Sequence, residues 1–113
     1  MSNGQLTIAI DAMGGDNSPF KVLKGAEIFN KINSKPKIIF FGKEEKITSC
    51  IKNNKIKIKN YKIFNTNEDV QDNDNANTIL RSRKNSSIYK GLEYVKKNPH
   101  SGFVSAGNTA AIM

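Results

Sequence analysis

The sequence lacks several features that mark common classes of protein. Cys50 is the only cysteine, so no internal disulfide can form and a reducing compartment suits the chain. No apolar run approaches the roughly 20 residues that span a bilayer, and the run at 6–10 is too short for a signal peptide. Neither a Walker P-loop nor a G-x-G-x-x-G fingerprint occurs, and no His, Cys and Asp cluster has metal-ligand spacing. We therefore predict a cytoplasmic protein without a metal or a cofactor.

Arginine is scarce as well, since Arg81 and Arg83 are the only two, although the net charge is +8. Clustered cations can bind nucleic acid by neutralising phosphates, so a basic nucleic-acid-binding module is the alternative interpretation. The chain has no helix-turn-helix, zinc ligands or aromatic-rich strand to support that interpretation. Lysine, asparagine and isoleucine all have AT-rich codons and all are frequent, so a base bias in the genome explains the excess of lysine. We expect a solvated basic surface and no nucleic-acid partner.

The pattern of apolar residues predicts alternating strands and helices. Strands are predicted at 6–10, 37–42, 56–64 and 102–104, helices at 20–32, 44–51 and 86–98, and a long polar loop at 65–77. The most apolar strands are typical of a parallel sheet that is covered on both faces. This order predicts a three-layer, Rossmann-like α/β sandwich with a mostly parallel sheet. The chain stops after Met113, one turn into a further predicted helix, so we expect 1–113 to be the N-terminal part of one truncated α/β domain.

The first candidate loop, Asp11–Asp16, follows the first predicted strand. Ligands of open α/β sheets bind at the carboxyl ends of the strands. Gly14 and Gly15 permit backbone conformations and a close approach that a Cβ would prevent. Asp11 and Asp16 could form a carboxylate pair for acid–base chemistry, although an aspartate that ends a strand more often hydrogen-bonds its neighbouring loop.

The second candidate loop, Ser105–Thr109, follows the last predicted strand. Gly107 leads into a predicted helix N-terminus, where free N–H groups and the helix dipole favour an anion. Ser105, Asn108 and Thr109 would add side-chain donors. Tight turns with a capping residue explain both loops equally well.

A third segment carries three cations, Arg81, Arg83 and Lys84, before the pair Ser86 and Ser87 at a predicted helix N-terminus. That position suits a phosphate or an acidic partner. A solvated basic loop in which one of the serines caps the helix explains the same residues, and the sequence alone slightly favours it.

Together these segments resemble a known family. The segment 8–16, followed by Pro19, resembles the opening motif of the PlsX phosphate acyltransferases, and 105–113 resembles that family's S-A-G-N-T-G-A-L-M segment. The segment 81–87 is similar to the basic stretch of the family, which also ends in a serine pair. The resemblance runs in order through essentially all 113 residues. Three positions depart from the pattern: Ala110 replaces a glycine, Ala76 a proline and Ile112 a leucine.

The resemblance implies an enzyme that transfers a fatty acyl group from acyl carrier protein to inorganic phosphate and forms an acyl phosphate for phospholipid synthesis. It implies a fold like that of the isocitrate and isopropylmalate dehydrogenases, a homodimer when full length, and peripheral contact with the membrane. Members are longer than this chain, so an inactive fragment of such an enzyme is a further hypothesis.

Phosphate itself attacks the thioester in that reaction, so the protein has to orient phosphate and stabilise the oxyanion. The candidate catalytic residues are Asp16 and Asn108. The predicted phosphate or substrate contacts are Asp11, Gly14, Gly15, Ser105, Gly107, Asn108 and Thr109. Contacts with phosphate or the acidic carrier protein are predicted for Arg81, Arg83, Lys84, Ser86 and Ser87.

Overall fold

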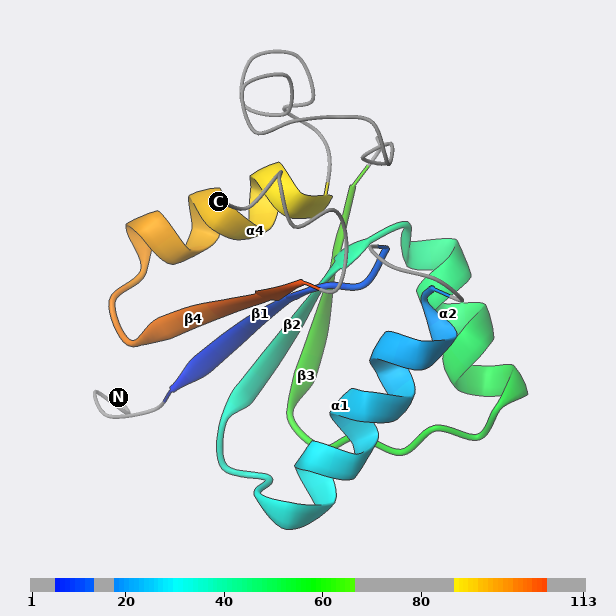
Figure 1. The fold of residues 1–113 in the computed structure, drawn as a ribbon. Coiled ribbons are helices and arrows are strands. Elements are labelled where there is room, and N and C mark those ends of the chain that lie inside the picture. The colour runs from blue at the N-terminus through cyan, green and yellow to red at the C-terminus, as the bar shows by residue number, and fades with distance from the viewer. Residues whose placement is uncertain (1–5, 14–17, 67–86, 106–113) are drawn as a thin grey trace.

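The computed structural model of the chain describes residues 6–13, 18–66 and 87–105. In these ranges strands alternate with helices along the chain (Figure 1). The strands are β1 (Thr7–Asp11), β2 (Lys37–Gly42), β3 (Tyr61–Asn65) and β4 (Ser101–Ser105). The helices are α1 (Phe20–Ile32), α2 (Glu44–Asn53) and α4 (Ser87–Lys97). None of these helices is long and apolar enough to cross a membrane.

The four strands form one parallel sheet in the order β3-β2-β1-β4. β1 lies between β2 and β4, and Ile10 is in register with Phe40 on one side and Val104 on the other. All the carboxyl ends therefore lie at one edge of the sheet. The chain adds β2 and β3 on one side of β1 and then crosses to the other side for β4. Ligands of open α/β sheets bind at such a reversal of strand order.

Helices cover both faces of the sheet, as Figure 1 shows, with α1 and α2 on one face and α4 on the other. Successive side chains of a strand point to opposite faces. On the first face, Ile10, Ile38 and Phe40 pack with Leu23 of α1 and Ile47 of α2. On the second face, the buried residues Ala9, Ile39 and Phe41 pack against Tyr94, Val95 and Phe103. The predicted three-layer α/β arrangement with a parallel sheet is confirmed.

The prediction for the third strand is wrong at its start, because β3 begins at Tyr61 and not at residue 56. The preceding backbone bonds to side chains of α1 instead of to a neighbouring strand. The Lys57 N–H donates to Glu27 Oε2 at 2.9 Å, and the Lys59 N–H donates to Asn30 Oδ1 at 2.8 Å. The Asn30 amide returns a bond to the Lys59 carbonyl at 3.0 Å. The alternation of lysine and isoleucine here thus reflects a loop that places Ile56 in the core.

Glu27 is the charged member of this contact between α1 and the loop, and it is buried. Its Oε1 accepts a hydrogen bond from Lys24 Nζ at 2.9 Å. This bond and the one from the Lys57 N–H hold the pKa of Glu27 below its ordinary value of 4.5. Burial opposes them by raising that pKa. The ionised form is therefore the one that fastens α1 to the segment before β3.

Candidate functional site

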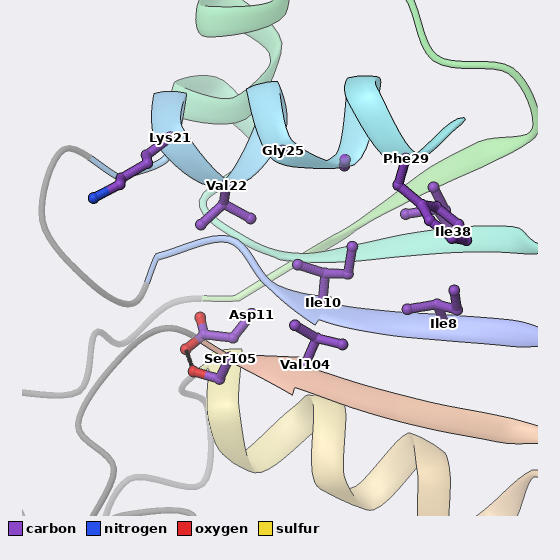
Figure 2. A pocket seen from close by; sticks show the side chains of 11 residues that line it. Ile8, Ile10, Asp11, Lys21, Val22, Gly25, Phe29, Ile38, Val104 and Ser105 are labelled. Atoms are coloured by element: carbon purple, nitrogen blue, oxygen red, sulfur yellow. Dashed lines mark hydrogen bonds between the residues drawn. The ribbon is translucent and has the colours of Figure 1, made fainter. Parts of the chain in front are cut away.

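Asp11 ends β1 at the carboxyl edge of the sheet, and only 1% of it is exposed. Its side chain shares the face of Ala9, toward α4. Ser105 Oγ donates a hydrogen bond to Asp11 Oδ2 at 2.8 Å, as the dashed line in Figure 2 shows. Ser87 Oγ donates to Asp11 Oδ1, which also accepts the Met13 N–H at 3.0 Å. Both carboxylate oxygens thus have donors, as a buried charge requires.

We call this group, the side chains of Asp11, Ser87 and Ser105 with the Met13 N–H, the Asp11 cluster. Three elements that lie far apart in the sequence build it. The parallel register sets Asp11 directly beside Ser105, at the ends of β1 and β4. Ser87 is the first residue of α4 and is 1% exposed, so the first turn of that helix is fixed against the sheet. The cluster therefore joins β1, β4 and α4 at one point.

Three of the sequence-predicted site residues, Asp11, Ser87 and Ser105, lie within the described ranges, and the fold brings them together. Asp11 does bond to its own loop through the Met13 N–H, but it also reaches two other elements. Ser87 is buried at the first residue of α4, and its hydroxyl donates to Asp11. The other predicted site residues fall outside the described ranges: Gly14, Gly15, Asp16, Arg81, Arg83, Lys84, Ser86, Gly107, Asn108 and Thr109.

The cluster nevertheless fixes where the three predicted segments attach to the fold. The first glycine loop continues the chain from Met13, the basic segment ends at Ser87, and the second glycine loop continues from Ser105. All three attachment points lie within one hydrogen-bonded group. Within the described ranges, no three His, Cys, Asp or Glu side chains gather as ligands for a metal ion. The Asp11 cluster thus holds the ends of three loops at the carboxyl edge of the parallel strands, where ligands of open α/β sheets bind.

Sequence reasoning missed an apolar groove between α1 and the β1–β4 half of the sheet, with a volume of about 370 Å³. Figure 2 shows its two ends: Lys21 and Val22 lie toward Asp11 and Ser105, and Phe29 and Ile38 lie toward the other end. The only sequence signal was Gly25, a glycine in the middle of a predicted helix. We call this space the α1–β4 groove. It is lined by Ile8, Ile10, Asp11, Lys21, Val22, Gly25, Ala26, Phe29, Ile38, Val104 and Ser105.

A family model described as a fatty acid synthesis protein matches residues 6–113. The chain belongs to that family. This confirms the resemblance to the PlsX phosphate acyltransferases. The match includes both glycine loops, the basic segment and every described strand and helix.

Curated relatives carry the name phosphate acyltransferase. That of Caldicellulosiruptor bescii is 36% identical over 110 residues, covering 96% of this chain and 32% of the relative. That of Wolbachia pipientis subsp. Culex pipiens is 36% identical over 115 residues, covering 98% of this chain and 33% of the relative. That of Coxiella burnetii (strain RSA 331) is 38% identical over 109 residues, covering 95% and 32%. The chain thus spans about a third of the length of these relatives.

Proposed function

We propose that this chain supplies the phosphate-holding part of an enzyme that transfers a fatty acyl group from acyl carrier protein to inorganic phosphate. Membership of the family and the name of the relatives support the reaction class. The structural observation that carries the proposal is the Asp11 cluster. It holds the ends of the two glycine loops and of the basic segment together at the carboxyl edge of the sheet.

In the proposed reaction a phosphate oxygen attacks the thioester carbonyl carbon. A C–O bond forms, the C–S bond breaks, and the carrier leaves as a thiolate that takes up a proton, so the products are acyl phosphate and the free carrier. No protein nucleophile is needed. Negative charge develops on the carbonyl oxygen, so hydrogen-bond donors that are already in place lower the barrier.

We assign phosphate binding to the helix N-terminus predicted at 107–109, with Asn108 as the donor to phosphate or the oxyanion. The Ser105 hydroxyl donates to Asp11, so Ser105 is assigned the role of holding the start of this loop. The Gly14 and Gly15 loop would close the site from the β1 side, with Asp16 as its candidate catalytic residue. Both loops leave the sheet from neighbouring strand ends, since Asp11 is in register with Ser105. We therefore propose that both loops contact the same phosphate.

Asp11 itself is assigned as a positioning residue. A carboxylate repels phosphate, and both of its oxygens already accept hydrogen bonds from the protein. Those bonds orient Ser105 at the start of the second loop and Ser87 at the end of the basic segment. Asp11 thus acts on phosphate through the residues that it holds.

The partners follow from the same reaction. Arg81, Arg83 and Lys84, with the hydroxyl of Ser86, would meet phosphate or the acidic surface of acyl carrier protein. The full-length enzyme would act as a homodimer in the cytoplasm, with peripheral contact at the membrane where the acyl phosphate is used.

A phosphate titration of the isotope-labelled chain, followed by NMR, tests the proposed site. We expect inorganic phosphate to shift the amide signals of 105–109, and Asn108→Ala to weaken binding by about tenfold, which corresponds to the loss of one charge-assisted hydrogen bond. Asn53→Ala, at the exposed C-terminal end of α2, is the matched control and should bind phosphate as the unmodified chain does. Unchanged phosphate affinity in Asn108→Ala would show that the assignment is wrong.

A second measurement separates binding from catalysis. The chain is incubated with acyl carrier protein thioester and phosphate, and hydroxylamine traps any acyl phosphate as a hydroxamate. Hydroxamate that forms only when phosphate is present and is absent with Asn108→Ala supports the proposal that the chain catalyses acyl transfer. Phosphate binding without product identifies the chain as a binding part of the enzyme that is inactive alone.

A further inference from the structure

Gly25 lies near the middle of α1 and lines the α1–β4 groove. A glycine inside a helix lowers helix stability relative to alanine, so it usually marks a place where something approaches the backbone closely. A Cβ built on Gly25 meets no heavy atom within 4 Å among the described residues. The space above Gly25 is therefore not filled by the part of the chain that the structure describes.

The walls of the groove are apolar along its length. Val22 and Phe29 come from α1, Ile8 and Ile10 from β1, and Val104 from β4. Val104 is 54% exposed, although it stands beside the buried Ile10. A volume of about 370 Å³ lies within the range of small-molecule sites. Apolar side chains left open to this extent lose the stabilisation that a covering apolar group would give.

Only one end of the groove is polar. Asp11 and Ser105 lie at that end on the sheet side, and Lys21 lies across the groove from them on the first turn of α1, with its amine pointing outward, as Figure 2 shows. This is the carboxyl edge of the sheet, where the Asp11 cluster holds the candidate phosphate loops. A ligand that fits has a polar head at this edge and an apolar tail that runs past Gly25 toward Phe29.

The handedness of the fold favours a ligand as the occupant of the α1–β4 groove and disfavours a further strand-to-strand connection of the chain. α1 connects β1 to β2 on one face, and the chain steps in the opposite direction to reach β4. Parallel crossovers are right-handed, so a connection from β4 to a further strand beside it would pass over the α4 face. Such a connection would leave the α1–β4 groove open.

We propose that the α1–β4 groove binds the apolar tail of the acyl substrate, with its carbonyl end at Ser105. The inference rests on the proposed function, because that reaction brings an acyl chain to this edge of the sheet. Gly25 is then a determinant of acyl-chain binding, since a side chain there would enter the path of the tail.

The test is an NMR titration of the isotope-labelled chain with dodecanoate, below its micelle concentration, and with acetate. Dodecanoate is expected to shift the Gly25 amide and the methyl groups of Val22 and Val104, whereas acetate leaves them unchanged. Gly25→Phe should lower dodecanoate affinity by about tenfold or more, because the tail loses apolar contact along the blocked length. Ile28→Phe is the matched control, since Ile28 is 56% exposed on the same helix and lies outside the groove.

Equal dodecanoate affinity in Gly25→Phe and Ile28→Phe would overturn the proposal. Circular dichroism checks that each variant is folded, and Val104→Phe narrows the groove from the sheet side if Gly25→Phe is not. If the groove signals shift with protein concentration and dodecanoate has no effect, a second copy of the chain is the occupant and the proposal is wrong. The phosphate titration follows the amide signals of 105–109, and the dodecanoate titration follows the signals of Gly25, Val22 and Val104. The two titrations therefore distinguish a wrong acyl-groove proposal from a wrong phosphate-site proposal.

Discussion

Gly25 and Gly91 both lie near the middle of a helix that packs on the sheet, but on opposite faces. At Gly91 a built Cβ would lie 2.3 Å from Phe103 Cε1, so the ring of a β4 residue packs directly on the α4 backbone. At Gly25 a built Cβ meets nothing within 4 Å. The comparison shows that β4 is tightly covered on its α4 side and open on its α1 side.

The difference follows from where each helix is fastened. The Asp11 cluster ties the first residue of α4 to the ends of β1 and β4. α1 is tied in the opposite direction, because Glu27 and Asn30 bond to the segment that leads into β3. The strand order is β3-β2-β1-β4, so these hydrogen bonds hold α1 toward the β3 end of the sheet. The groove is the space left at the β4 end.

The largest expected effect on stability comes from breaking the Asp11 cluster, which holds α4 against the sheet. Asp11→Ala leaves two serine hydroxyls and the Met13 N–H without their acceptor, which should lower the free energy of unfolding by about 3 kcal/mol or more. Urea unfolding measures the loss. Ser105→Ala removes one of these bonds and should cost about 1 kcal/mol. Similar losses in both variants would mean that the carboxylate does not hold α4 and β4 together.

The two glycines give the next effect, with opposite signs. Gly91→Ala forces a methyl group into the Phe103 ring and should destabilise the fold by about 1–3 kcal/mol. Gly25→Ala has room for the methyl group and should stabilise it by about 0.5–1 kcal/mol. Thermal unfolding of both variants measures the difference. Phe103→Leu should remove most of the Gly91→Ala penalty in the double variant. Destabilisation by both alanines would contradict an open α1 side.

The smallest expected effect is a change in how stability depends on pH when Glu27, which bonds α1 to the segment before β3, is replaced. The pKa of Glu27 is lowered in the folded chain by Lys24 and the Lys57 N–H, so its stabilisation is present above the ordinary value of 4.5. That stabilisation is lost as the pH falls through the lowered folded pKa. We expect Glu27→Gln to lose less stability than the unmodified chain between about pH 5 and pH 3. Urea unfolding at stepped pH measures this slope.

Glu45→Gln, on an exposed part of α2, is the control and should follow the unmodified chain through the same pH range. If Glu27→Gln keeps the full acid sensitivity, then another carboxyl group sets it, and α1 is not fastened through the ionised Glu27.

The prediction of the fold succeeded where local periodicity carries the information. α1 and β2 have the predicted bounds 20–32 and 37–42, because their apolar residues repeat with the spacing of a helix and of a strand buried on both faces. The prediction failed before β3, where the backbone of 57–59 bonds to Glu27 and Asn30. These partners are distant in sequence, so no local pattern reveals them.

The sequence by itself determined the alternation of strands and helices and the family, since each depends on residues that are close together in the chain. Only the tertiary structure decided that Asp11 meets Ser87 and Ser105, because that contact requires β4 to lie beside β1. It also decided that Gly25 faces open apolar space while Gly91 is packed against Phe103. A glycine in a helix looks the same in a sequence in both cases, and the element packed against it makes the difference.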